Sequence, residues 1–488
     1  MPEFTDLPRG LPNHRPEDGK AAQGLWMHPD KPYESGKWAH DPSKLFLGAD
    51  LRGRRLGLAD DRHLLTVAGS RAGKGTSAII PNLLMYEGSM IVIDPKGENA
   101  NETAERRGKG NGIKAGGLGH DVFVIDPFHT AHKVADEYRA GFNPLAGLDP
   151  KSKSFIDDCN GIAESLVVKP KDDKNPFFND TAQFVIRGLI AWVAMSPDHE
   201  KRNLPEVYRI ISMPESEFEK VLEAMSKAVG EGWGLPTNVA FAIQTMIGSD
   251  EWGKILSSVR QHLMFMDSPE MADALRNNDR NPDMYAWKMG GQSIYLCLPA
   301  GLLHTHNRFF RLFLNQLLSA VEKNKGEPKI RAVMMLDEMH VLGHMQILQT
   351  SAALIAGYHV LIWSFWQDFS QLESIYGKGW ETFIGNASVF QSFGVNDLKT
   401  LKYISDRLGV SSVLSLSNAE INKTQAATNF TGQSKSIQQS PLLTHDEVAY
   451  HFSRQSNSQL IIYPGTSPIW IKRLPYYEKF FDDMRPSQ

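Results

Sequence analysis

The sequence predicts an α/β protein in which helices cover both faces of a mostly parallel sheet and an all-α segment interrupts the chain. Two apolar runs that end in an acid, at Asp94 and at Asp126, favour the sheet. Continuous apolar strands of this kind, alternating with helices, are typical of a parallel sheet that is buried on both faces. The insertion is predicted because residues 151–285 carry helical patterns and little strand signal.

The composition is that of a folded protein with several domains. The chain has 488 residues, 41% of them hydrophobic and 22% charged, which allows about two to four domains. The net charge of −4 gives no overall attraction to a polyanion, so contact with nucleic acid requires a local basic patch or a lined pore. Cys159 and Cys297 lack metal-ligand spacing and are expected to be reduced and structural, as in a cytosolic protein.

No membrane segment is predicted. The N-terminus, MPEFTDLPRG, has an early acid and no apolar run, unlike a signal peptide. Between Glu338 and Asp368 no Asp, Glu, Lys or Arg occurs, and this stretch is long enough to cross a bilayer. It nevertheless contains several His and Gln residues and is broken by GYH at 357–359. We therefore expect a buried helix followed by a buried strand.

The elements of the first part follow in order. Residues 1–40 are rich in Pro, Gly, His and charge and are expected to form an extended or disordered arm. Residues 41–150 are expected to be the first part of a nucleotide-binding domain. A hairpin leads there into a buried strand, LLTVAG. The following segment, TSAIIPNLLMY, fits a helix with Pro81 in or near its first turns.

The second part begins with the predicted all-α insertion at 151–285, with helical segments such as DTAQFVIRGLIAWVAM. Residues 286–488 are expected to complete the nucleotide-binding domain. They contain the strands QSIYLCLP, RAVMMLDE, HVLIWSFWQD and SVFQSFG, and a long amphipathic helix that begins near Arg308. QLIIYPGTSPIWIKRLPYY predicts a closing hairpin, and the residues at 411–440, rich in Ser, Asn, Thr and Gln, predict an exposed loop.

A glycine-rich loop after LLTVAG carries the first chemical signal. Small residues let consecutive backbone N–H groups turn toward a phosphate, and the following helix N-terminus adds positive potential. Lys74 would reach the β- and γ-phosphates, and the hydroxyl of Thr76 is available for Mg²⁺. The motif departs from the usual pattern twice, with Ala68 in place of the first Gly and Gly75 directly after Lys74. A plain glycine turn is the alternative. The candidate nucleotide-binding residues of the loop are Gly69, Ser70, Arg71, Ala72, Gly73, Lys74, Gly75 and Thr76.

Adjacent acids end the strand AVMMLDE. At the carboxyl edge of a parallel sheet such acids lie beside a phosphate loop. Asp337 can hold a hydrated Mg²⁺, and Glu338 can orient or deprotonate the attacking water. The alternative is that the pair only begins a helix.

Two further residues follow strands. Gln367 could contact the γ-phosphate or the attacking water, with ordinary capping as the alternative. Asp94, in DPKG, competes with Asp337 for the metal. Asp337 is preferred because it alone comes with a second acid, which leaves Asp94 as a neighbouring residue that bonds to the metal through water.

Eight motifs in order resemble type IV secretion coupling ATPases, the TraG/TraD-like group. They include GSRAGKGTSAIIPNLL, IVIDPKGEN, FNPL, NPFFNDTAQFVIRGLI, MLDEMHVLG, SFWQDFSQLESIYG and FGVNDLKTLKYISDRLG, and they lie within about residues 45–480. The resemblance implies a RecA-like P-loop NTPase motor domain with an inserted all-α domain that faces substrate. It also implies ATP and Mg²⁺ as cofactors and a homo-hexamer when active, while allowing a monomer in isolation.

The resemblance further implies partners and residue roles. The partners would be single-stranded DNA, a relaxase or effector proteins, and components of the type IV secretion channel. The loop around Lys74 would bind phosphate, Asp337 and Glu338 would form the second nucleotide motif, and Gln367 would be the sensor.

The chain departs from the family in two ways. Members usually carry an N-terminal membrane anchor, which this sequence lacks, so we expect a cytoplasmic protein at the inner face of the inner membrane, held there by partners. Members often carry an arginine near AGYH that reaches a neighbouring subunit, but no Arg occurs between Arg331 and Arg407. Arg308 and Arg311 are candidates for that cation, with the solvated face of a helix as the alternative.

Three functions are compatible with these observations. The first is an ATP-hydrolysing coupling motor that delivers relaxase-bound DNA or protein effectors to a secretion channel. The second is a cytosolic DNA-pumping ATPase of the related translocase group. The third is a nucleotide-gated docking platform with little turnover, which the missing arginine favours.

Overall fold

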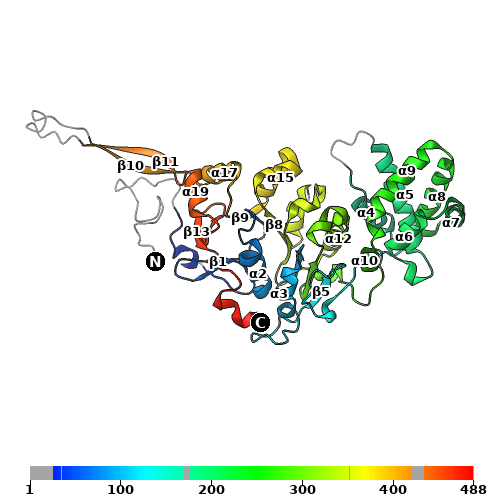
Figure 1. Ribbon diagram of the computed structural model, residues 1–488, viewed down its shortest axis with the longest axis horizontal. Coiled ribbons are helices and arrows are strands. Elements are labelled where there is room, and N and C mark those ends of the chain that lie inside the picture. Colours follow the sequence, from blue (N-terminus) through cyan, green and yellow to red (C-terminus); the bar gives the residue numbers. More distant parts are fainter. Residues whose placement is uncertain (1–25, 35, 170–175, 351, 419–432, 487–488) are drawn as a thin grey trace, which may run out of the picture. The chain divides into compact units, whose positions relative to one another are not determined.

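The computed structural model describes residues 26–34, 36–169, 176–350, 352–418 and 433–486 (Figure 1). The chain forms two compact units. The first unit contains the chain up to Tyr86 together with Trp363–Asp482, and the second contains Glu87–Ile362 together with the last residues from Asp483.

The first unit is built on a mixed sheet with the strand order β2-β1-β13-β12-β9-β3-β8. Strand β3 pairs in parallel with β8 and with β9, and the remaining pairs are antiparallel. The expected hairpin before LLTVAG is β1 with β2, and the expected closing hairpin is β12 with β13. The strands are β1 (Leu45–Ala49), β2 (Arg55–Leu58), β3 (His63–Ala68), β8 (Val360–Trp366), β9 (Ala387–Phe393), β12 (Ser458–Ile462) and β13 (Ile469–Lys472).

The helices of the first unit are short. A π-helical turn, Gly75–Ile79, leads directly into the helix that the sequence predicts after the glycine loop, and Pro81 lies in its first turn. Proline is tolerated there because the first N–H groups of a helix have no intrahelical partner. The α-helices are α1 (Lys31–Glu34), α2 (Ile80–Met85), α15 (Phe369–Tyr376), α16 (Glu381–Gly385), α17 (Leu398–Leu408) and α19 (His445–His451).

One predicted loop is wrong in its described part. Residues 411–440 were expected to form an exposed loop, but β10 (Val410–Asn418) and β11 (Gln433–Pro441) form an antiparallel hairpin that links α17 to α19. Backbone hydrogen bonds hold such a ladder whatever the side chains are, and neither strand contains Gly. Residues 419–432 lie outside the described part of the chain.

The second unit contains the parallel strands that the apolar runs predict. Their order is β7-β4-β6-β5, and every pair is parallel. All residues of β4, β6 and β7 are buried, which explains why the sequences of β4 and β7 are continuously apolar rather than alternating. The strands are β4 (Met90–Ile93), β5 (Asp121–Ile125), β6 (Gln292–Leu296) and β7 (Ala332–Leu336).

Helices dominate the rest of the second unit. Residues 151–169 and 176–285 contain helices and no strand, and α5 to α9 gather in one group, drawn in green (Figure 1). The proposed domain boundaries at 41, 151 and 286 remain predictions. The helices are α3 (Glu98–Arg107), α4 (Phe155–Leu166), α5 (Pro176–Ala194), α6 (Leu204–Ile211), α7 (Glu215–Lys227), α8 (Leu235–Met246), α9 (Asp250–Leu263), α10 (Pro269–Ala274), α11 (Met284–Trp287), α12 (Leu303–Lys323), α13 (Gln346–Thr350) and α14 (Ala352–Gly357).

The described end of the predicted N-terminal arm packs against the first unit. Trp26 is buried and its ring lies edge-on to that of Trp470, with the ring centroids 5.3 Å apart. Trp38 is also buried, against Tyr463. Residues 26–34 and 36–40 are thus attached to the first unit through two tryptophans that bury large apolar surfaces, while the predicted arm over 1–40 remains a prediction. Residues 1–25 lie outside the described residues.

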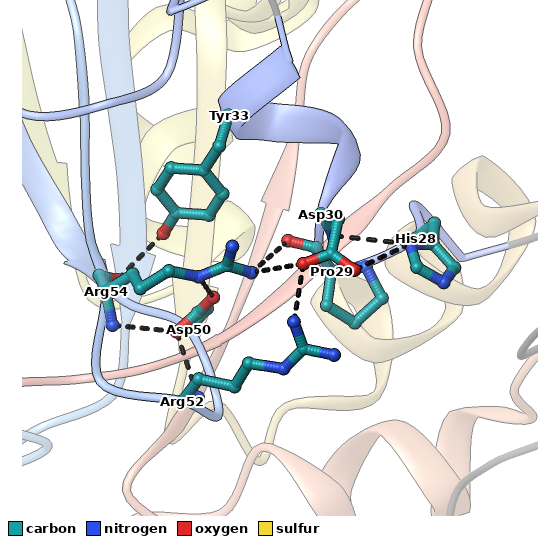
Figure 2. Close-up of polar contacts among 7 residues, drawn as sticks. All are labelled: His28, Pro29, Asp30, Tyr33, Asp50, Arg52 and Arg54. Carbon is teal, nitrogen blue, oxygen red and sulfur yellow. Dashed lines mark hydrogen bonds and ion pairs between the residues drawn. The ribbon is translucent and has the colours of Figure 1, made fainter.

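A cluster of ion pairs accompanies this packing (Figure 2). Arg54 Nε donates to Asp50 Oδ2 at 2.7 Å, and Arg54 Nη2 donates to Asp30 Oδ1 at 2.8 Å. Arg52 Nη1 donates to the same Asp30 oxygen at 2.6 Å. Tyr33 Oη donates to the Arg54 carbonyl at 2.8 Å. The segment around α1 is thereby joined to the turn between β1 and β2.

Within the described residues, no helix combines the length and apolar character needed to cross a membrane. The uncharged stretch from Glu338 to Asp368 is divided into α13, α14 and β8. This division agrees with the expectation of helix followed by strand.

Candidate phosphate-binding loop and acidic cluster

The glycine-rich loop begins where β3 ends. Ala68 is the last residue of β3 and does not have a positive φ. A glycine is therefore not required at this position, which explains the first departure from the usual motif. The turn itself needs the left-handed region at Arg71 (φ 54°) and at Gly73 (φ 99°). It is closed by a hydrogen bond from the Ala72 N–H to the Gly69 carbonyl at 3.1 Å.

Lys74 lies at the N-terminus of the following helical turn. Its side chain is largely buried, and Nζ donates to the Ala68 carbonyl at 3.4 Å. The ammonium is thus folded over the loop, at the helix end where the backbone N–H groups and the helix dipole favour an anion.

Two hydroxyls lie next to Lys74. Thr76 Oγ1 donates to the Gly73 carbonyl at 3.3 Å, and Ser77 Oγ donates to the same carbonyl at 2.6 Å. Of these two hydroxyls, only that of Thr76 was predicted from the sequence to be a metal ligand. The adjacent Thr-Ser pair was the signal that could have added Ser77.

Close packing explains the small residues of the loop. A Cβ on Gly69 would lie 2.1 Å from the Gly394 carbonyl oxygen, a distance too short for any side chain at this position. Ala68 and Ala72 form a buried apolar cluster with Phe393. The end of β9 therefore forms a firm support behind the loop.

Gln367 lies at the same sheet edge as the loop. Val67 of β3 is paired in parallel register with Trp366 of β8. The next residues, Ala68 at the end of β3 and Gln367 just after β8, therefore lie side by side. The Gln367 N–H donates to Gln371 Oε1 at 3.2 Å. The first unit thus brings together Gln367 and the start of the loop, and the sensor role of Gln367 remains a prediction.

The second unit brings together the predicted acids. Val92 of β4 is paired in parallel register with Met335 of β7. Asp94 and Asp337 lie two residues further along the chain, and each follows directly after its strand, so the two acids are neighbours at the same sheet edge. Asp337 Oδ1 accepts from the Glu338 N–H at 3.0 Å, and Glu338 Oε2 lies 3.2 Å from His340 Nδ1. Glu338 has a φ of 49°, a left-handed conformation that is strained for a non-glycine residue.

Asp94 is the most buried of these acids, with 1% of its surface exposed. Burial is the main cause of a pKa raised to about 7; the hydrogen bonds from Ala100 and Asn99 oppose this shift, and the negative charge of Asp337 adds to it. Oδ2 accepts from the Ala100 N–H at 2.8 Å, and Oδ1 accepts from Asn99 Nδ2 at 3.2 Å. Asp94 therefore caps the first turn of α3. Its predicted place near the metal remains a prediction.

The two candidate trans arginines both bond to backbone of their own unit. Arg308 Nε donates to the Leu166 carbonyl at 3.2 Å. Arg311 Nη1 donates to the carbonyls of Leu342 and His344 at 3.1 and 2.8 Å. Neither side chain simply covers a solvated helix face. The loop with Gln367 belongs to the first unit, and the cluster with Asp337 belongs to the second.

Comparison with known proteins decides the family. The model of the family "Type IV secretory system Conjugative DNA transfer" matches residues 19–488. The chain belongs to this family. The predicted resemblance to type IV secretion coupling proteins is thereby confirmed.

The relatives with similar sequences are named as proteins of conjugal transfer and of type IV secretion. The conjugal transfer protein TraG of Agrobacterium fabrum (strain C58 / ATCC 33970) is 25% identical over 434 residues, covering 87% of this chain and 61% of that protein. The type IV secretion system-coupling protein VirD4 of Bartonella quintana (strain Toulouse) is 24% identical over 430 residues, covering 86% of this chain and 63% of that protein. The chain thus spans less than two thirds of the length of these relatives.

Solved structures of this family share the fold. The bacterial conjugative coupling protein TrwBdeltaN70 in its unbound monoclinic form aligns with a TM-score of 0.63 at 15% identity, covering 91% of this chain and 90% of that one. The plasmid coupling protein TrwB in complex with ADP and Mg²⁺ aligns with a TM-score of 0.61 at 15% identity, covering 88% and 89%. The predicted fold class, a mostly parallel α/β sheet flanked by helices with an inserted all-α part, is confirmed by this likeness.

Proposed function

We propose that the chain is an ATP-hydrolysing coupling motor that recruits relaxase-bound single-stranded DNA or protein effectors and delivers them to a type IV secretion channel. The observation that carries this proposal is the phosphate loop. Its left-handed residues, its buried Lys74 and the helical turn behind it form the arrangement that binds polyphosphates. The family match and the TrwB complex with ADP and Mg²⁺ support the same reading.

The residues of the chain suit ATP and Mg²⁺. The loop offers backbone N–H groups and an ammonium, and Mg²⁺ prefers the oxygen donors that Thr76 and Asp337 carry. Bound Mg²⁺ would neutralise charge on the phosphate oxygens. Lys74 would hold the β- and γ-phosphates, and Glu338 would orient the attacking water and accept its proton. Gln367 would contact the γ-phosphate or the attacking water, and Asp94 would bond to the metal through water.

The decisive experiment measures ATP turnover by the wild-type protein and by Lys74→Ala, with and without single-stranded DNA, alongside a mass measurement of the assembly. We expect turnover that falls about 100-fold in Lys74→Ala, because a preorganised charge on the phosphates is lost. We expect a homo-hexamer under turnover conditions, and a monomer in isolation agrees with the proposed function as well. Flat turnover without assembly in every condition contradicts the motor.

The dependence on partners distinguishes the remaining functions. Stimulation by DNA alone favours a cytosolic DNA-pumping ATPase, whereas stimulation that requires a relaxase or channel components favours coupling. We propose that the protein works at the cytoplasmic face of the inner membrane and contacts it through these partners. The docking platform with little turnover is favoured by one observation, since Arg308 and Arg311 are both engaged within their own unit. Nucleotide binding without hydrolysis would support it.

A further inference from the structure

Arg473 lies directly after β13, about 400 residues from the phosphate loop in sequence but in contact with it. Its Nη1 donates to the Ala72 carbonyl, and its Nη2 donates to the Arg454 carbonyl at 2.7 Å. The guanidinium lies 4.9 Å from the ring centroid of Phe393, within the range of a cation–π contact. Only 6% of the residue is exposed. The arginine is thus fixed behind the loop by three different segments of the first unit.

This contact sets the orientation of one peptide in the loop. In a trans peptide the C=O and the following N–H point in opposite directions. Because the Ala72 carbonyl points to Arg473, the N–H of Gly73 points away from it, toward the other side of the loop. Gly73 precedes Lys74, and its N–H is one of those that a phosphate loop must present to its anion. Arg473 also lies next to Gly73 itself, since a Cβ on Gly73 would lie in van der Waals contact with Arg473 Nη1, at 3.5 Å.

The charge of Arg473 is not neutralised within the described part of its unit. No ion pair between Arg473 and a carboxylate occurs among the described residues, and its buried Nε has no hydrogen-bond partner. Burial lowers the pKa of Arg473, which reflects the free energy needed to keep a cation away from water. A polyphosphate in the loop would bring the missing negative charge close to this cation.

From these contacts we propose that Arg473 is a positioning residue of the phosphate loop. It fixes the Ala72–Gly73 peptide for phosphate binding and adds positive charge behind the loop. The inference rests on the proposed function, because it assumes that the loop binds a nucleotide. It goes beyond that function by assigning a role to the closing hairpin, which ends at Arg473.

The test measures binding of ADP and of inorganic pyrophosphate by calorimetry to the full chain, in the presence of Mg²⁺. Arg473→Met removes the charge and the donors, and it should weaken both ligands about tenfold, the effect of losing one charge-assisted hydrogen bond. Arg473→Lys keeps the charge without the planar guanidinium group, and its affinity for both ligands should lie between those of the wild type and Arg473→Met. Arg407→Met, which removes an exposed arginine on α17, is the matched control and should bind as the wild type does.

The outcomes separate the two proposals. If the wild type binds neither ligand, the proposed function fails and the inference fails with it. If the wild type binds and Lys74→Ala does not, but Arg473→Met binds both ligands as tightly as the wild type, only the inference fails. A loss for ADP without a loss for pyrophosphate also overturns it, because Arg473 would then act on the nucleoside. Thermal unfolding of each ligand-free variant shows whether the substitution has disturbed the structure in general. If Arg473→Met is disturbed in this way, Arg473→Lys decides: the inference is overturned if the lysine variant binds no better than Arg473→Met.

Discussion

A Cβ atom on Gly394 would lie 2.5 Å from the Cβ of Ala72, well inside the distance at which two carbon atoms can pack. Gly394 has a φ of 63°, and its N–H donates to the Phe452 carbonyl at 2.6 Å. The residue that follows β9 is therefore restricted both by its backbone conformation and by the phosphate loop beside it. The close approach of the two segments therefore requires a small residue both at Gly394 and at Ala72.

Gly394→Ala should lower the free energy of unfolding by about 2–4 kcal/mol, from overpacking against Ala72 and from a side chain at positive φ. Adding Ala72→Gly should restore part of this loss, because it removes the atom that the new methyl group meets. Urea unfolding of the two single variants and the double variant measures the coupling, for which we expect about 1–3 kcal/mol. Strictly additive effects would show that the two residues do not meet.

The left-handed backbone of Glu338 gives a second prediction. Glu338→Gly should raise the free energy of unfolding by about 1 kcal/mol, because glycine adopts this conformation without strain. Glu338→Gln keeps the strain and should leave stability unchanged. Under the proposed function both variants lose ATP turnover and retain nucleotide binding. A Glu338→Gln variant that still hydrolyses ATP would remove Glu338 from the catalytic role.

The parallel strands of the second unit could be predicted because burial on both faces leaves a continuous apolar run. Such a run is visible at residues 90–93 and at 332–336. The candidate acids could also be located, since Asp94 and Asp337 follow directly after these strands. Their adjacency could not be predicted, because it depends on the pairing of β4 with β7 and on its register.

Contacts between distant segments account for the other differences. Arg473 and Gly394 gain their importance from packing against Ala72, which no local pattern records. The buried Trp26 and Trp38 were hidden in a segment whose composition resembles a disordered arm. Similarly, the Ser-rich composition near β10 obscured a strand that backbone hydrogen bonds hold.

Asn82 gives a third prediction, on the attachment of α2 to β1. The residue is fully buried, and Oδ1 accepts from the Phe46 N–H at 2.7 Å while Nδ2 donates to the Phe46 carbonyl at 2.9 Å. Asn82→Ala would leave both backbone groups without partners and should cost about 2–5 kcal/mol in unfolding free energy. Asn82→Leu fills the same space without hydrogen bonds. If it unfolds like the wild type in urea, the hydrogen bonds contribute little.

The last prediction concerns the acid sensitivity of His120. Its Nδ1 lies 3.0 Å from Arg107 Nη2, and its Nε2 lies 3.0 Å from the Glu87 carbonyl. The Nε2 proton therefore bonds to Glu87, and Nδ1 accepts from the guanidinium. The pKa of His120 is lowered to about 3, mainly by burial and in addition by the positive charge of Arg107.

The sign of the pH dependence follows from this shift. An unfolded histidine titrates near pH 6.5, so between pH 6.5 and about 3 the unfolded chain binds a proton that the folded chain does not. The contribution of His120 to stability is complete above pH 6.5 and is lost as the pH falls, by up to about 1.4 kcal/mol per pH unit. His120→Gln can keep both hydrogen bonds without titrating, so its unfolding free energy should fall less steeply between pH 7.5 and 5. Urea unfolding at these pH values measures the difference, with His445→Gln, an exposed histidine on α19, as the control. Equal slopes for His120→Gln and the wild type would show that His120 is protonated in the folded protein as readily as in the unfolded chain.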